Sequence, residues 1–276
     1  MDSTEIRAGD REQIRDEALA RSVLYGVLSL ALYVPTEETL RRLQTENTKQ
    51  TLQEAASFLV GSAQEETEKP QAEPGADEDM NLVARMEEWL WTFEALTLDQ
   101  WLTTHGRLFG HTARGVVCPY EAEYGQEGLF EQPRRLATIV GFYSAFGLTP
   151  RETERERPDH LSCELEFLDF LSRKEALALE LGDEPTRSET HKALRLFLKD
   201  HVGRFGLAFA RSLREQDPEG FHGKLGDVLF DFLAMECRRV RVQAGPLLLQ
   251  LRSAEEDNVP MACGGESELI QLQVPE

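Results

Sequence analysis

Apolar side chains recur along this chain at steps of three and four residues, the spacing that places them on one face of an α-helix. The segments with this spacing are residues 14–33, 82–109, 136–146, 161–181, 194–213 and 225–242. Strict alternation of apolar and polar residues, which is typical of a half-buried strand, is confined to residues 269–274. The pattern predicts an all-α protein, and it leaves open whether residues 269–274 form a strand or an irregular tail.

Residue types that begin and end helices support this division. Thr36 follows a proline and precedes two glutamates, so we expect its hydroxyl to cap the start of a helix. Gly147 follows the apolar run that ends at Phe146, and we expect it to stop that helix. The helical segments therefore have definite ends and do not form one continuous rod.

The organisation along the chain favours one domain. We expect an all-helical domain over residues 1–243, interrupted by an acidic, proline-containing mobile loop at residues 62–80 that is too polar to bury a core. Residues 244–276 lose the helical spacing and contain three prolines, so we expect an irregular C-terminal extension.

Charge excludes some classes of partner. Among the 276 residues, 50 are acidic and 30 are basic, which gives a formal net charge of −20. Such a surface repels nucleic acid and anionic membranes and attracts basic peptides. We therefore expect no nucleic-acid partner.

The compartment is predicted from the cysteines and from the apolar runs. The chain has no C-x-x-C pair, and its four cysteines are scattered at Cys118, Cys163, Cys237 and Cys263. This usage suits a reducing compartment. The apolar run at residues 23–34 is shorter than the about 20 residues that span a membrane, and the first residues lack the basic region of a secretory signal. We expect a cytoplasmic protein without stable membrane insertion.

A glycine-rich stretch at residues 110–133 carries the first group of candidate binding residues. Tyr120 and Tyr124 offer ring faces that attract arginine, and Glu121 and Glu123 between them can accept bidentate hydrogen bonds from a guanidinium group. The alternative is structural: the rings hold the loop against the helices, and the glutamates are ordinary surface acids. The residue types alone leave both interpretations open, with the structural one favoured.

The second group lies where the next helix is predicted to begin, at residues 158–161. Asp159 is placed to cap the free N–H groups of that helix. His160 and Glu164 are one helical turn apart, so their side chains can meet, and the imidazole could exchange protons near neutral pH. Capping alone would explain Asp159, and a pair such as His160 and Glu164 is more often structural. As loop and helix-end residues, these polar groups are also free to face a ligand and not the core.

Two reactive sites are suggested by residue types, but the sequence favours neither. His160, Cys163 and Glu164 have a spacing that could ligate zinc, but no further ligand pair completes a site. Cys118 and His160 could imitate a nucleophile and its base, although nothing in the sequence brings them together. The glycines form no nucleotide-binding loop. We therefore expect no metal and no enzymatic activity.

The order and spacing of these pieces resemble the TorD-type family of redox-enzyme maturation chaperones, whose relatives include the DmsD and NarJ proteins. The resemblance covers residues 91–171 well and the flanking helices loosely. It is carried by the helix end Arg107-Leu108-Phe109-Gly110, the turn Cys118-Pro119-Tyr120-Glu121 with Tyr124, and the Asp159-His160-Leu161 corner leading into Glu164-Leu165-Glu166-Phe167.

The resemblance implies a TorD-like single-domain helical bundle that acts as a cytoplasmic, system-specific chaperone. Its client would be the catalytic subunit of a molybdenum enzyme of the dimethyl sulfoxide reductase family. The chaperone would hold the client's twin-arginine leader and its apo form until molybdopterin guanine dinucleotide is inserted and export can follow. It implies no resident cofactor, although transient contact with that dinucleotide or with GTP is part of the analogy, and it leaves monomer and helix-swapped dimer open.

The resemblance also implies which residues bind the client. The set is Pro119, Tyr120, Glu121, Tyr124, Asp159, His160, Leu161 and Glu164, with Phe109 and His201 as secondary candidates. One alternative is a NarJ-like assembly factor for a subunit that is not exported. A less favoured one is an enzyme that uses Cys118, His160 and Glu164. The sequence does not identify the client's substrate.

Overall fold

The computed structural model describes residues 8–67, 81–110, 115–125, 131–149 and 156–252. The helices, in chain order, are α1 (Ala8–Leu32), α2 (Glu37–Leu43), α3 (Glu46–Thr67), α4 (Leu82–Ala95), α5 (Leu98–Phe109), α6 (Glu131–Ala145), α7 (Leu161–Leu181), α8 (Glu184–Phe197), α9 (Gly203–Gln216) and α10 (Phe221–Arg239). A 3₁₀ turn, η1 (Glu121–Glu123), and a π-helical turn, η2 (Leu198–Val202), complete the set. Within these ranges β structure is limited to two isolated bridges, so the all-α prediction is confirmed.

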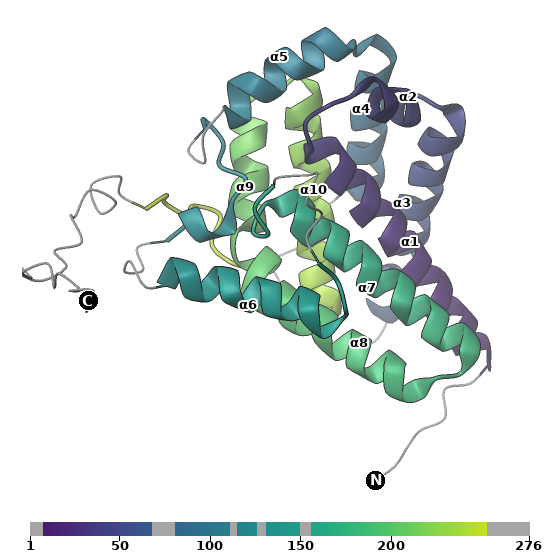
Figure 1. The fold of residues 1–276 in the computed structure, drawn as a ribbon. Helices are drawn as coiled ribbons and strands as arrows, with labels where there is room; N and C mark the ends of the chain where they lie inside the picture. Colours follow the sequence, from purple (N-terminus) through teal and green to yellow (C-terminus); the bar gives the residue numbers. More distant parts are fainter. Residues whose placement is uncertain (1–7, 68–80, 111–114, 126–130, 150–155, 253–276) are drawn as a thin grey trace, which may run out of the picture.

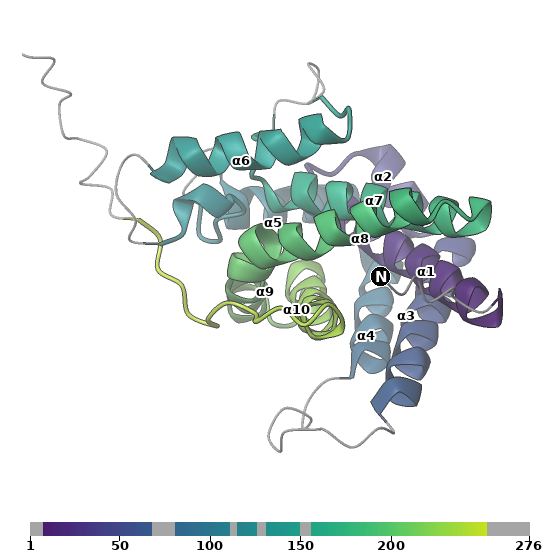
Figure 2. The ribbon, with the colours of Figure 1, turned by 90° about the horizontal axis from the view of Figure 1, so that it is seen from below.

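The helices pack mainly in pairs. Helix α1 lies along α7, and α9 lies along α10, while α4 contacts both α3 and α10 (Figure 1). Helix α6 lies beside α7 and α8, as Figure 2 shows from below, and Phe142 of α6 packs against Phe167 and Phe197 of those two helices. Helix α7 therefore occupies a central position, with α1, α6 and α8 around it.

The core follows from the apolar spacing. Leu24, Leu28 and Leu32 recur every fourth residue of α1 and are fully buried, as are Leu161 and Leu165 at the start of α7. Burying a leucine side chain stabilises a fold by roughly 1.5–3 kcal/mol. The contact of α1 with α7, elements far apart in the sequence, therefore holds the N-terminal helix to the centre of the molecule.

The predicted helix boundaries hold in several places. The hydroxyl of Thr36 accepts a hydrogen bond from the Thr39 backbone N–H at 3.1 Å and caps α2. Helix α6 ends at Ala145, and Gly147 follows with a φ of 73°, which suits glycine. Helix α7 has the predicted bounds, residues 161–181.

Two sequence predictions need correction. The segment 82–109 is not one helix: α4 and α5 are separated at Leu96 and Thr97, and Thr97 caps α5. The expected mobile loop at residues 62–80 begins too early, because α3 continues through Thr67 and residues 62–67 are helical. The remainder of that loop, residues 68–80, lies outside the described residues.

The described part of the expected C-terminal extension returns to the body of the protein. The Gly245 N–H donates to the Gly203 carbonyl at 2.8 Å, and the Arg252 N–H donates to the Glu123 carbonyl at 2.9 Å. Residues 244–252 contain no helix. Residues 253–276, including the 269–274 pattern, lie outside the described residues. None of the helices in the described ranges is long and apolar enough to cross a membrane.

Candidate functional site

The two segments singled out in the sequence meet through their backbones. The Glu121 N–H donates to the Asp159 carbonyl at 2.9 Å, and the Leu161 N–H donates to the Pro119 carbonyl at 2.8 Å. These bonds flank an antiparallel bridge between Tyr120 and His160. We call residues 118–124 and 156–161 together the bridge corner. It places the turn η1 directly against the start of α7.

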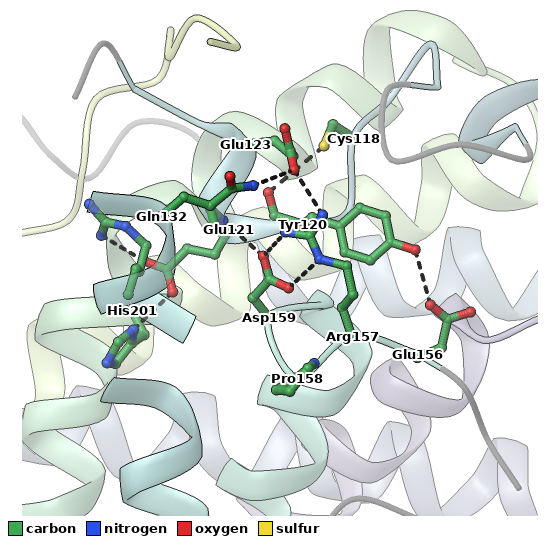
Figure 3. A network of polar contacts seen from close by, with 12 residues as sticks. Cys118, Tyr120, Glu121, Glu123, Gln132, Glu156, Arg157, Pro158, Asp159 and His201 are labelled. Carbon is green, nitrogen blue, oxygen red and sulfur yellow. Dashed lines mark hydrogen bonds and ion pairs between the residues drawn. The ribbon is translucent and has the colours of Figure 1, made fainter. Parts of the chain in front are cut away.

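Arg157 joins the two sides of the bridge corner (Figure 3). Its Nε and Nη2 donate to the two carboxylate oxygens of Asp159 at 3.0 and 2.8 Å, and its Nη1 donates to Glu123 Oε1 at 2.8 Å. The guanidinium carbon lies 4.6 Å from the centroid of the Tyr120 ring. Carboxylates and a ring face were predicted to bind an arginine here, and the arginine they bind belongs to the chain itself.

Asp159 does not cap α7, contrary to the sequence prediction. Its fully buried carboxylate points toward η1, where it also accepts a hydrogen bond from the Ala122 N–H at 3.0 Å. The cap of α7 is His160, whose Nδ1 accepts from the Ser162 N–H. Burial raises the pKa of the Asp159 carboxyl, although the charge and hydrogen bonds of Arg157 oppose this. Asp159 therefore holds the bridge corner closed.

Glu121 is the buried centre of a second set of contacts. Its Oε1 accepts from Arg135 of α6 at 3.0 Å and from Arg204 of α9 at 3.2 Å. Its Oε2 lies 2.8 Å from Nδ1 of His201, which stands in η2. Burial alone would raise the pKa of Glu121, but the hydrogen bond and charge of His201 and the two guanidinium groups lower it below its ordinary value. One ionised carboxylate thus ties η1 to three other elements.

The pKa of Glu164 is shifted in the opposite direction to that of Glu121. Its side chain is fully buried, and neither of its oxygens accepts a hydrogen bond from an N–H or O–H group of the described residues. Burial and the neighbouring carboxylates of Glu121 and Asp159 raise its pKa well above the ordinary value. The raised pKa favours the neutral, protonated carboxyl of Glu164, which suits a buried side chain beside two other carboxylates.

His160 does not behave as a proton carrier near neutral pH, which corrects the sequence interpretation. Its Nδ1 meets the Ser162 hydroxyl, and the expected pairing with Glu164 is not found in the described residues. Burial lowers the pKa of His160 to about 3. The ring packs edge-on against Tyr120 at 5.2 Å between centroids and stacks with Tyr33 at 6.2 Å. His160 is a packed, neutral cap.

The structure also argues against the reactive sites. Burial raises the pKa of the Cys118 thiol to about 12, which keeps it from forming the thiolate that a nucleophile needs. Its backbone carbonyl accepts a hydrogen bond from the Tyr124 hydroxyl at 2.7 Å. In the described ranges, no three His, Cys, Asp or Glu side chains are placed to hold a metal ion, so His160, Cys163 and Glu164 form no such site.

The predicted client-binding residues are brought together, but they are not displayed to solvent. The bridge corner and the first turn of α7 contain Pro119, Tyr120, Glu121, Tyr124, Asp159, His160, Leu161 and Glu164. Tyr120 is half-buried and all the others are buried. Apart from Tyr120, these side chains therefore do not face a ligand directly. The carboxylates of Asp159 and Glu121 are bonded to arginines of the chain itself, and His160 is bonded to Ser162. A role of this set in client binding stays a prediction.

The two secondary candidates have different surroundings. His201 joins the bridge corner through Glu121. Phe109 ends α5, where the φ of 66° at Gly110 stops the helix, and its ring packs against Phe209 and His222. Phe109 is thus a buried core residue.

Sequence reasoning missed the cations of this site. Arg157 is the residue that closes the bridge corner, and Arg135 and Arg204 neutralise Glu121. The Tyr120 hydroxyl also donates to Glu156 at 3.1 Å. The available signal for Arg157 was its position two residues before an aspartate at a helix start. For Arg135 and Arg204 the sequence carries no such signal, since only the tertiary packing brings them to η1.

Comparison with known proteins gives this arrangement a context. The family model described as nitrate reductase delta subunit matches residues 73–211, half of the chain, and this range contains the whole bridge corner. A selenate reductase assembly chaperone protein of Thauera selenatis is 31% identical over 140 residues, which are 49% of this chain and 66% of that protein. A dimethyl sulfide dehydrogenase assembly chaperone protein of Rhodovulum sulfidophilum is 32% identical over 143 residues, 49% of this chain and 55% of that protein.

The similarity is thus regional, and the chain spans between about half and about two thirds of the lengths of these two relatives. The matched region runs through α4–α9 and includes the sequence motifs on which the resemblance was first based. By this match the chain belongs to the nitrate reductase delta subunit family of TorD- and NarJ-type proteins.

Proposed function

We propose that this protein is an assembly chaperone for the catalytic subunit of a molybdenum enzyme of the dimethyl sulfoxide reductase family. The observation that carries the proposal is that the family match spans the bridge corner, together with the two relatives named as assembly chaperones of a selenate reductase and a dimethyl sulfide dehydrogenase. In this proposal the chain works in the cytoplasm and holds the apo-subunit and its twin-arginine leader until cofactor insertion precedes export.

The charge states in the bridge corner favour binding over catalysis. Its thiol, Cys118, has a raised pKa, and the neutral His160 has a lowered one, so neither is ready for nucleophilic or general acid–base work near pH 7. Binding without a covalent step needs only a stable surface and reversible contacts. The proposal therefore requires no resident cofactor, and passing contact with molybdopterin guanine dinucleotide or GTP remains an expectation.

We assign different parts to the residues of the bridge corner. Tyr120 and Arg157 are partly exposed and would touch the client directly. Asp159 and His160 are buried, and they would act as positioning residues by holding that pair in place. A leader arginine that entered between Tyr120 and Asp159 would have to displace Arg157, which weakens binding and allows release of the client.

The test is affinity capture of the tagged full-length chain from its own host's cytoplasm, followed by mass spectrometry. We expect the uncleaved catalytic subunit of a molybdenum enzyme to be retained. Failure to retain it, with that subunit shown to be expressed, would overturn the proposal.

A second preparation, in which the leader of the subunit is deleted, separates two versions of the function. Loss of capture supports recognition of a leader for export. Unchanged capture favours the NarJ-like alternative, in which the subunit is recognised without a twin-arginine leader.

A further inference from the structure

The outward face of α4 carries a tryptophan that the core does not use. Trp91 is 76% exposed, whereas Trp89 and Trp101, the other two tryptophans of the chain, are fully buried. A tryptophan side chain offers a large apolar surface, and leaving it in water is unfavourable. Exposed apolar surface with a polar rim is typical of interaction sites. Trp91 is therefore a candidate contact for a partner.

The residues around Trp91 form a hollow on the outer side of α4, which we call the α4 hollow. It has a volume of about 550 Å³ and lies between α4 and the turn that precedes α10. Its rim is mainly acidic, with Glu87 and Glu88 from α4, Glu219 from the turn, and Lys224 from α10. Three carboxylates thus face one ammonium group around an exposed indole, an arrangement that favours a cationic partner.

Only one of the three rim carboxylates is paired with a cationic side chain. Lys224 Nζ donates to Glu88 Oε2 at 3.0 Å, and Arg85 lies 3.5 Å from the same oxygen; the hydrogen bond from Lys224 is the main cause that lowers the pKa of Glu88. Glu87 and Glu219 have no ion-pair partner in the described part of the chain, and no arginine there lies over the Trp91 ring. Two free carboxylates therefore remain available beside the indole.

We propose that this hollow binds an arginine side chain from an extended basic segment of the client. The guanidinium group would stack on the Trp91 indole, and Glu87 and Glu219 would accept its N–H groups. Arginine suits this site better than lysine because its planar guanidinium both stacks on a ring and bonds carboxylates in a fork. The inference rests on the proposed function, since it names a contact for that same client.

The bridge corner shows the same chemistry within the chain. There Arg157 lies over the Tyr120 ring and bonds to Asp159 and Glu123. The α4 hollow likewise combines an aromatic ring, Trp91, with the carboxylates Glu87 and Glu219, and the partner would supply the guanidinium group. The two places share no residue, so each can be substituted without changing a side chain of the other.

The first experiment uses the fluorescence of Trp91 in the full-length chain. The probe is a capped, otherwise neutral peptide with two adjacent arginines, and its control has two lysines in their place. Because Trp89 and Trp101 are buried, acrylamide quenches mainly Trp91. We expect the arginine peptide to protect Trp91 from quenching, with half-saturation at a several-fold lower concentration than for the lysine peptide. Unchanged quenching with the arginine peptide would overturn the inference.

Variants locate the effect. Trp91→Ala should weaken capture of the client subunit about 5- to 10-fold, and Trp91→Phe should restore part of it, as expected for loss and partial return of a stacking face. The double change Glu87→Gln with Glu219→Gln should weaken capture and make it less sensitive to salt. Leu181→Ala, at a residue that is 72% exposed on α7, is the matched control and should leave capture unchanged.

The outcomes separate this inference from the proposed function. Equal capture of the client by the unchanged chain and by Trp91→Ala overturns the arginine site and leaves the chaperone function standing. Capture by neither overturns both. Capture that falls with Trp91→Ala but not with Leu181→Ala supports the arginine site.

Discussion

The bridge corner and the α4 hollow are built from the same kinds of group and have different consequences. Each combines an aromatic face with carboxylates, Tyr120 with Asp159 and Glu123 in one and Trp91 with acids of α4 in the other. In the bridge corner the chain's own Arg157 satisfies these groups, whereas no such arginine lies over Trp91 in the described structure. The supply of an internal cation therefore decides whether such a cluster stabilises the fold or is free to recognise a partner.

The two places should also contribute differently to the free energy of unfolding. A buried carboxylate that loses its cation keeps the cost of its desolvation, so its partners are hard to remove. An exposed carboxylate is solvated by water, and its removal changes stability little. Substitutions in the bridge corner should therefore lower the free energy of unfolding, and substitutions in the α4 hollow should not. The following predictions test this contrast from the largest expected effect to the smallest.

The largest effect is expected at Glu121. Glu121→Ala removes the buried carboxylate that binds Arg135, Arg204 and His201, so each of these three side chains loses that partner. We expect the free energy of unfolding to fall by about 3–5 kcal/mol, as for other broken buried ion pairs. Urea denaturation monitored by circular dichroism measures this loss. The matched control, Glu87→Ala in the α4 hollow, should change it by about 0.5 kcal/mol or less; equal losses at the two positions would remove the contrast.

Arg157→Ala should lower the free energy of unfolding somewhat less than Glu121→Ala does. It leaves the buried Asp159 with one backbone donor, at Ala122, and removes a partner of Glu123, but Arg157 itself is one-third exposed, with a side-chain exposure of 32%. We expect a loss of about 2–3 kcal/mol in the same denaturation experiment.

Arg157→Lys, as a companion variant, should recover only part of this loss, because an ammonium group cannot bond both Asp159 oxygens in a fork. Arg173→Ala is a control for removing a surface arginine, since Arg173 is 64% exposed. A control loss as large as that of Arg157→Ala would mean that burial of Asp159 is not the cause.

Glu164 should make the stability of the folded protein depend on pH. Its pKa is raised in the folded protein, so the unfolded chain loses this proton at lower pH than the folded chain does. The stabilising contribution of the protonated form is complete below the ordinary pKa and is lost as the pH rises from about 4.5 toward the folded value.

Glu164→Gln cannot ionise and should remove this loss. Relative to the unchanged protein, the variant should become more stable as the pH rises above about 4.5, by up to about 1.4 kcal/mol per pH unit. Urea denaturation from pH 5 to pH 8 measures the difference. A difference that stays constant with pH would show that Glu164 is ionised in the folded state.

The sequence predicted most of the helices because their buried residues keep a strong period, as Leu161 and Leu165 do in α7. Helix α3 was missed, since its buried residues include Ala55 and Ala56, which give a weak apolar signal between polar neighbours. A helix of this kind is recognised only when the surfaces of α1 and α4 are present to cover it.

The site was predicted in part for a related reason. The resemblance brought Tyr120 and His160 into one set, and the structure places them in a bridge. Burial was not predicted, because it depends on cations such as Arg204 that arrive from distant segments. The hollow at Trp91 was missed as well, since one tryptophan at a helical spacing reads as core until the packing shows which face of α4 is covered.

The smallest stability effect is expected at Trp91, and it is the sharpest test of the comparison. Trp91→Ala removes an indole that is 76% exposed and is not one of the residues of the buried core cluster. We expect the free energy of unfolding to change by about 0.5 kcal/mol or less, in contrast to the loss of about 3–5 kcal/mol expected for truncating a buried tryptophan such as Trp89. Denaturation of Trp91→Ala and Trp89→Ala side by side measures both. A large loss of stability for Trp91→Ala would show that the indole stabilises the fold, and it would remove the reason to expect a partner at this position. A small loss would show that stability does not explain the exposed tryptophan.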